Sequence, residues 1–142
     1  MAFTVRGHGV GLRNVGSYQI SGHPYLTGTA DMGTAPREHK IEFPFVTKSI
    51  TVIASGSAGQ TAEGTNYLRV HFNAESDGEV LTAHHFITLD SDEDSITFDV
   101  KCKEIYLTNV VDSAGFELYA SLTSIPTASM YTLTGSGLTD AS

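Results

Sequence analysis

Several residue types are scarce in this sequence, and each scarcity excludes a class of protein. A single cysteine, Cys102, excludes an intramolecular disulfide. Tryptophan is absent, which weakens the case for a sugar-binding protein. No apolar run approaches the ~20 residues that a membrane-spanning helix needs. The first seven residues lack the apolar stretch of a signal peptide, so we expect synthesis in a cytoplasm and no membrane partner.

Charged residues are also few, at 17% of the chain, and they are unevenly distributed. Residues 1–48 have five basic and three acidic side chains, whereas residues 49–142 have three basic and thirteen acidic ones. The acidic part argues against nucleic-acid binding, which needs clustered Lys and Arg on the phosphates. The weakly basic first part could lie on the acidic part of another subunit, although chance explains the difference equally well.

What the sequence does have is alternation of apolar and polar residues. The longest example is residues 96–103, where Ile96, Phe98, Val100 and Cys102 are expected to face a core. Shorter segments repeat this period, with inward sets Ile50, Val52 and Ala54; Leu68, Val70 and Phe72; and Phe116, Leu118, Ala120 and Leu122. No stretch has the period of a helix. The pattern predicts an all-β protein, an antiparallel β-sandwich of jelly-roll or Ig-like type with about seven or eight strands.

Irregularities in the alternation indicate where these strands bend or end. Pro44 cannot donate to a strand ladder, so the strand around residues 41–45 is expected at an edge or at a bulge. The period shifts by one over residues 46–49. A second shift suggests a bulge near Glu104, and Pro126 is expected to end the strand that contains Phe116.

Composition divides the chain into three parts. Residues 1–36 hold seven glycines and no convincing strand longer than about four residues, so we expect an extended glycine-rich N-terminal arm there. Residues 37–134 are expected to form the sandwich, and residues 135–142 a C-terminal tail. We expect the arm to order itself by contact with its own domain or with a neighbouring subunit. The interface residues expected are Arg6, Leu12, Arg13, Tyr18 and Tyr25 in the arm, and Tyr67 and Tyr119 in the body.

No residue pattern predicts catalysis, a cofactor or a metal. Asp90, Asp92 and Asp94 could hold Ca²⁺ weakly from a hairpin, but an EF-hand fails at Ser95 and Lys101, and a solvated acidic turn is the simpler interpretation. His71 could meet His84 or His85 across strands, yet no third ligand has suitable spacing. Cys102 lies on the apolar face and is expected to be a buried, inert thiol. The chain has no P-loop and no nucleophile–base–orienter set, so we do not expect an enzyme.

Three segments carry a resemblance to a known group of proteins: residues 11–22, residues 43–53 and residues 89–107. In these segments, and over most of the chain from about residue 10 onward, the sequence resembles small virion structural proteins of tailed phages that infect marine bacteria and cyanobacteria. The resemblance implies a non-enzymatic component of a phage particle. It carries no catalytic residues onto this chain.

Combined with the expected fold, this resemblance favours a capsid decoration, or cement, protein located in the virion, which would stabilise the shell through subunit contacts made by the arm. We expect a homotrimer, because capsid lattices offer three-fold positions, with the major capsid protein or other virion proteins as further partners. A tail, neck or baseplate component is the first alternative. A carbohydrate-binding module of a receptor-binding fibre is the second.

Overall fold

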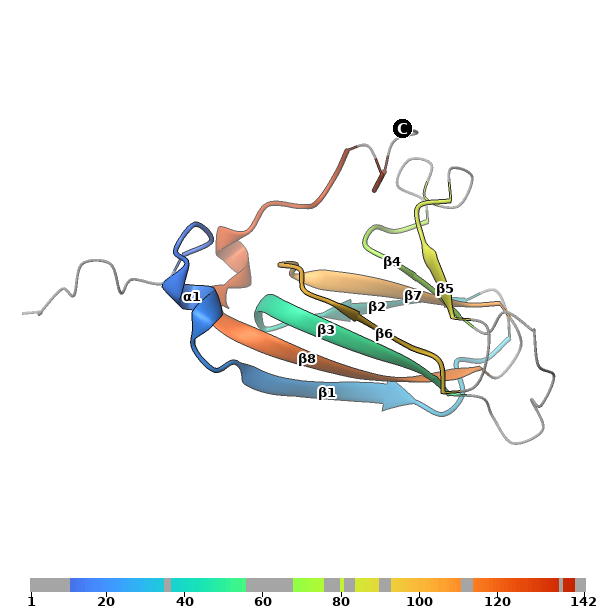
Figure 1. Cartoon of the computed structure of the whole chain (residues 1–142). Coiled ribbons are helices and arrows are strands. Elements are labelled where there is room, and N and C mark those ends of the chain that lie inside the picture. Colours follow the sequence, from blue (N-terminus) through green and yellow to red (C-terminus); the bar gives the residue numbers. More distant parts are fainter. Residues whose placement is uncertain are drawn as a thin grey trace, which may run out of the picture.

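The computed structural model describes residues 11–34, 37–55, 68–75, 80, 84–89, 93–110, 114–135 and 137–139. Its eight strands form two antiparallel four-stranded sheets that pack face to face (Figure 1). Sheet A contains, in spatial order, β1 (His23–Thr29), β8 (Gly115–Pro126), β3 (Phe45–Ser55) and β6 (Ser95–Phe98). Sheet B contains β2 (Arg37–Glu42), β7 (Glu104–Asn109), β4 (Leu68–His71) and β5 (Ile87–Leu89). The predicted all-β sandwich is therefore confirmed.

The strand order is that of a jelly roll. β1 pairs with β8, β2 with β7, β3 with β6 and β4 with β5, each pair antiparallel. This is the pattern of one long hairpin, strands 1–4 against strands 5–8, rolled up into two facing sheets. An Ig-like sandwich groups its strands differently, so the order selects the jelly roll from the two predicted alternatives.

The core lies between the sheets and is built from the predicted inward faces. Ile50, Val52 and Ala54 of β3 are buried, as are Leu68 and Val70 of β4. The four predicted inward residues of β8 are buried too: Phe116, Leu118, Ala120 and Leu122. Phe72 is only partly buried and packs against this core.

The segment after β6 differs from the prediction of one strand over residues 96–103. β6 ends at Phe98, and residues 99–103 cross from sheet A to sheet B. Buried Thr47 holds the crossing: its Oγ1 donates to the carbonyl of Val100 (2.8 Å) and accepts from the N–H of Cys102 (3.0 Å). Apolar and polar residues still alternate in the crossing segment, and Val100 and Cys102 pack toward the core. For this reason the segment cannot be distinguished from a strand in the sequence. The slip near Glu104 is the start of β7 in the other sheet, so the predicted bulge there is wrong.

The irregularities expected before β3 are confirmed. β2 is an edge strand of sheet B and ends at Glu42, two residues before Pro44. The register of β3 against β8 shifts twice between Phe45 and Ser49. Pro126 is the last residue of β8.

The N-terminal part contains more regular structure than the sequence predicted. Residues 16–19 form the one-turn helix α1 (Gly16–Gln19), and β1 is a seven-residue strand, so the expectation of no strand longer than about four residues is wrong. β1 pairs with β8 of its own chain and so belongs to the sandwich. Lys48 Nζ donates to the carbonyl of Ile20 (2.9 Å), which anchors the residues after α1 to β3. The division of the chain into arm and body at residue 36 stays a prediction, and residues 1–10 lie outside the described residues.

The chain after β8 turns back across the molecule. A 3₁₀ turn, η1 (Thr127–Ser129), follows Pro126, and the next residues run over the outer side of sheet B (Figure 1). Asn73, after β4, donates its Nδ2 hydrogen to the carbonyl of Leu133 (2.6 Å). This bond fastens the returning segment to the turn that follows β4.

Candidate functional site

Two surface features of the sandwich could carry function, one on each sheet. The first is the β1–β8 face, which we define as Leu26, Gly28, Ile53, Glu117 and Tyr119 on the outer side of sheet A. Strand register places Leu26 beside Tyr119, and Gly28 beside Glu117, which in turn pairs with Ile53. Leu26 is 75% exposed and Tyr119 is 44% exposed, so two large apolar side chains stand next to each other in solvent.

The β1–β8 face is hollowed at its centre. The hollow has a volume of about 400 Å³, and these residues line it together with Thr27 and Leu118. Gly28 adds no side chain, and β1 approaches β8 so closely there that a Cβ would lie 2.6 Å from the carbonyl oxygen of Phe116. The close approach therefore requires glycine and leaves the space between Leu26 and Ile53 open.

The structure places the predicted interface residues in different environments. Tyr119 lies on the β1–β8 face. Tyr25 points the other way and packs edge-on against Phe43 of its own core (5.4 Å between ring centroids). Leu12 and Tyr18 also pack against this core, and the Tyr18 hydroxyl donates to the carbonyl of Leu12 (2.9 Å).

The predicted interface residues also include a tyrosine with a raised pKa and an exposed arginine. Desolvation, with a smaller contribution from Tyr131, raises the pKa of Tyr18 above its usual value. Arg13 is exposed, and Arg6 and Tyr67 lie outside the described residues.

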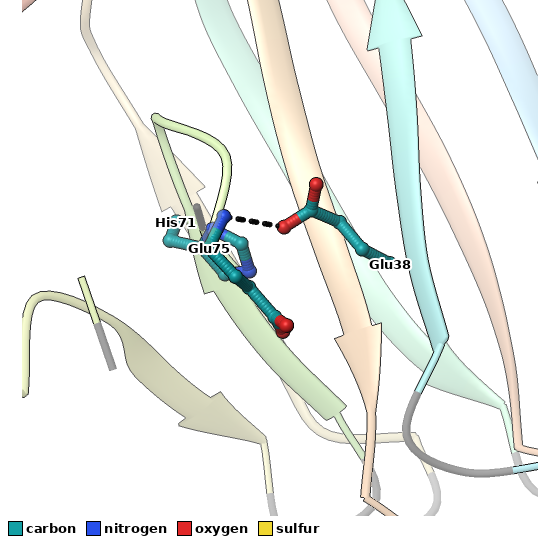
Figure 2. A group of neighbouring side chains, drawn as sticks. All are labelled: Glu38, His71 and Glu75. Carbon is teal, nitrogen blue, oxygen red and sulfur yellow. Dashed lines mark hydrogen bonds between the residues drawn. The ribbon is translucent and has the colours of Figure 1, made fainter. Parts of the chain in front are cut away.

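The second feature is a polar cluster on the outer side of sheet B. Glu38 extends from β2, His71 is the last residue of β4, and Glu75 lies in the turn that follows (Figure 2). One ligand atom from each of these three side chains lies within 4.8 Å of the others. Among the described residues, this Glu38–His71–Glu75 cluster is the group of His, Cys, Asp or Glu side chains whose geometry could hold a metal ion.

Hydrogen bonds orient every member of the cluster. His71 Nδ1 donates to the carbonyl of Asn73 (2.7 Å), and its Nε2 lies 2.9 Å from Oγ1 of Thr108. The Thr108 hydroxyl donates to Oε1 of Glu75 (2.7 Å). The backbone N–H of Glu75 donates to Oε2 of Glu38 (2.7 Å), the contact drawn in Figure 2.

Because Leu68, Val70 and Phe72 were expected to face inward, the alternation places His71 on the outer side of its sheet. It lies there, yet it is only 1% exposed. Its ring stacks on that of Tyr106 of β7, with 5.9 Å between centroids and an interplanar angle of 7°. The turn of residues 73–75 folds over it through the bond to Asn73. A buried polar ring of this kind is held by specific partners, because an unpaired one would be costly.

The histidine pairing that the sequence left possible, without predicting a metal site, is not part of the cluster. The convergent group contains His71 but neither His84 nor His85. His84 instead lies exposed with its ring 4.9 Å from that of Phe86. Of the acidic turn, Asp90 and Asp92 lie outside the described residues, so its cation binding stays open.

Sequence reasoning missed the cluster because its members are far apart in the chain and not on neighbouring strands. β7 lies between β2 and β4, so Glu38 and His71 meet across an intervening strand that supplies Thr108. The four-residue spacing of His71 and Glu75 is the one local signal, and it is a weak one.

Two other titratable groups, Lys40 and Cys102, have shifted pKa values. Lys40 Nζ lies 3.1 Å from Glu42 and 3.0 Å from Glu104, and hydrogen bonds to these two carboxylates raise its pKa. The free thiol of Cys102 is buried, as expected, and desolvation raises its pKa to about 11. A thiol with this pKa is protonated at neutral pH and is a poor nucleophile.

Comparisons with known proteins give no further identification: no protein family, no curated protein and no solved structure matches this chain significantly. No helix in the described part of the chain is long and apolar enough to cross a membrane.

Proposed function

We propose that this chain is a non-enzymatic structural protein of a phage particle, a capsid decoration protein that assembles with copies of itself on the shell. The observation that carries the proposal is the exposed apolar β1–β8 face on a rigid sandwich. Large apolar side chains gathered on one surface are typical of protein interfaces. The jelly roll and the resemblance of residues 11–22, 43–53 and 89–107 to phage virion proteins support the particle assignment. The fold alone would not, since jelly rolls also serve as lectins and enzymes.

A second copy of the chain is the proposed occupant of the β1–β8 face. The chain has a net charge of −8, so copies repel one another over most of their surface. Glu117 is the one charged side chain among the described residues that line the hollow. Copies that meet there therefore bury apolar surface while bringing few charges together.

The oligomeric state tests this proposal directly. Light scattering coupled to size exclusion should give a multiple of the chain mass of 15.2 kDa. Three chain masses are expected if the face docks on a different surface of the next copy, and two chain masses if two such faces pair with each other. Replacing Leu26 and Tyr119 together by serine should yield a folded monomer, because the central apolar contacts are lost. Ile87→Ser is the matched control, since Ile87 has the same exposure as Tyr119 (43% against 44%) but lies on sheet B. A parent chain that is monomeric at every concentration contradicts self-association through this face.

The place in the particle is tested by copy number. A decoration protein should appear in hundreds of copies on a stained gel of purified virions, in molar ratio to the shell protein. A tail, neck or baseplate component would give a far weaker band, and absence from the particle would exclude the proposal altogether.

A further inference from the structure

We propose that the Glu38–His71–Glu75 cluster is a binding site for a divalent transition-metal ion, with Zn²⁺ the best match, which fastens β2 to β4 and its following turn. The inference is independent of the proposed assembly on the β1–β8 face, because the two features lie on the outer sides of different sheets. It also goes beyond the sequence, which predicted no metal ligand.

The first argument is the hydrogen-bond arrangement of His71. The carbonyl of Asn73 can only accept, so Nδ1 of His71 has to carry the hydrogen of that bond. In a neutral imidazole this leaves the lone pair on Nε2, which is the tautomer that binds a metal through Nε2. Metal-binding histidines characteristically donate their other N–H to a backbone carbonyl or a carboxylate, as His71 does here.

The second argument is that the cluster has more acceptors than donors. Thr108 has one hydroxyl hydrogen, and it donates it to Glu75. In the neutral ring, the lone pair of His71 Nε2, 2.9 Å from Thr108 Oγ1, therefore faces an oxygen with no hydrogen left to give, whereas a protonated Nε2 would donate to that oxygen. A cation bound to Nε2 at about 2.0–2.1 Å would take the place of the Thr108 hydroxyl, which has to rotate away, and would satisfy Nε2 and the carboxylates together.

The third argument is uncompensated negative charge. Within the described residues, the ion pairs are those of Lys40 with Glu42 and Glu104, so neither Glu38 nor Glu75 has a cationic side chain at ion-pair distance. Arg69 lies on the same side of β4, but its guanidinium stacks on Phe86, with Cζ 4.6 Å from the ring centroid. Two neighbouring carboxylates without a cation repel each other, and a divalent ion removes this repulsion.

The turn that contains Glu75 also contains a buried side-chain oxygen, Oδ1 of Asn73, that is not hydrogen-bonded to any described residue. Asn73 is 3% exposed, its Nδ2 donates to the carbonyl of Leu133, and its Oδ1 has no hydrogen-bond partner among the residues that the structure describes. Buried polar atoms without a partner are rare in proteins, and a bound ion or water is one way in which they are satisfied. Asn73 stands midway between His71 and Glu75 in the chain, so this oxygen belongs to the loop that supplies two of the proposed ligands.

The donor set and its dimensions select the class of metal. One imidazole nitrogen with two carboxylates suits Zn²⁺ and its first-row neighbours, whereas Ca²⁺ and Mg²⁺ prefer oxygen alone. Zn²⁺ binds N and O ligands at about 2.0–2.2 Å, so ligands around one ion lie roughly 3–4 Å apart. The three ligand atoms already lie within 4.8 Å, and the half-buried glutamates can close the remaining gap by side-chain rotation.

Titration of the full-length, tag-free and metal-free chain with ZnCl₂ in a calorimeter tests the site. We expect one Zn²⁺ per chain and a rise in melting temperature on binding, because the ion binds the folded form. Glu38→Gln and Glu75→Gln should each weaken Zn²⁺ binding at least tenfold, since Gln keeps the size and the hydrogen-bonding oxygen but loses the charge. Melting of the metal-free variants checks that both still fold. His71 is too deeply buried for its replacement to be the main test.

Two matched controls separate this site from incidental binding. Glu117→Gln, an exposed change on β8, and His84→Gln, an exposed histidine outside the cluster, should both bind Zn²⁺ like the parent. Co²⁺ should give a visible absorption band that Glu38→Gln abolishes. The proposal is overturned by a parent chain that binds no Zn²⁺, by unchanged affinity in Glu38→Gln and Glu75→Gln, by loss of binding in His84→Gln, or by equal affinity for Ca²⁺.

Discussion

At the scale of single residues, Thr47 and Cys102 show how the chain leaves one sheet for the other. Both are buried, and they contact each other through the Thr47 hydroxyl, 3.4 Å from the Cys102 sulfur. The same hydroxyl takes over the hydrogen bonds that strand pairing would otherwise provide to Val100 and Cys102. One side chain thus satisfies buried backbone groups where regular pairing stops.

Thr47→Val tests this role. Valine has the same shape but no hydroxyl, so the carbonyl of Val100 and the N–H of Cys102 lose their partner inside the protein. We expect the free energy of unfolding to fall by about 1–3 kcal/mol, the usual cost of an unsatisfied buried group. Urea denaturation measures the change. Thr97→Val is the control. The Thr97 hydroxyl is hydrogen-bonded to the Thr51 hydroxyl on the exposed side of sheet A, so its removal should change the free energy of unfolding by less than about 0.5 kcal/mol.

The thiol of Cys102 predicts a loss of stability in alkali. Burial raises its pKa from an ordinary 9.0 to about 11, so between these pH values the unfolded chain loses the thiol proton while the folded chain keeps it. The contribution of the neutral thiol to the free energy of unfolding is therefore complete below pH 9 and is lost as the pH rises to about 11. The expected loss is about 2–3 kcal/mol.

Urea unfolding of the parent and of Cys102→Ala at pH 8 and pH 11 isolates this effect. Lysines and tyrosines titrate in both proteins, so the difference between their pH dependences reports Cys102 alone. Equal pH dependence in the two proteins would show that the folded thiol ionises normally.

At the scale of secondary structure, β8 organises sheet A because it pairs with β1 on one side and β3 on the other. Its first residue, Gly115, is buried where the end of β1 turns away. A Cβ at this position would lie 2.6 Å from the carbonyl oxygen of Thr29 and 2.8 Å from that of Ala30. Both atoms belong to the backbone, so the strand end itself would have to move.

Gly115→Ala should therefore destabilise the protein by about 1–3 kcal/mol, the usual cost of overpacking. Differential scanning calorimetry measures this as a lower melting temperature. Gly11→Ala is the matched control, because a Cβ there meets no atom of the described residues within 4 Å. Equal melting temperatures for the two variants would show that β1 yields to the added methyl group without cost.

The comparison of sequence with structure is clearest at this scale. Alternation predicted the inward faces of β3, β4 and β8, because burial of one sheet face is a local property of the chain. It could not show that residues 99–103 change sheets, since the chain stays extended and keeps its period there. β1 was missed because Pro24 and Gly28 are typical of turns, whereas here Gly28 is required by the close approach of β8.

The Glu38–His71–Glu75 cluster could not be predicted for a different reason. Its members come from β2, β4 and a turn, and they meet only once β7 has paired between the two strands. Strand order depends on contacts between distant parts of the chain, which a local pattern does not contain.

At the scale of the whole molecule, the described part of the predicted arm consists of a turn and the short helix α1 followed by a strand of sheet A. Residues 23–29 complete sheet A, and Tyr25 fills a place against Phe43 in the core. α1 lies at the end of the sandwich beyond β1 (Figure 1). The two portions of residues 1–36 should therefore respond differently to removal.

Deletion of residues 1–22 should leave a chain that unfolds cooperatively, with a modest loss from the contacts of Leu12, Tyr18 and Lys48. Deletion of residues 1–36 should cost much more, because it removes an edge strand and the burial of Tyr25, which alone contributes about 1–3 kcal/mol. Thermal unfolding followed by circular dichroism compares the two. If both deletions melt at the same temperature, β1 contributes nothing to the stability of the sandwich.

The rolled hairpin also determines when the protein can fold during its synthesis. β8 is the last strand to leave the ribosome, and until Gly115–Pro126 has emerged neither β1 nor the full length of β3 has its partner. Pairings between such remote segments form slowly. We therefore expect β1 and much of β3 to stay unpaired until β8 emerges, even if β4 has already paired with β5 and β3 with β6. A chaperone could bind these apolar β-segments in the meantime.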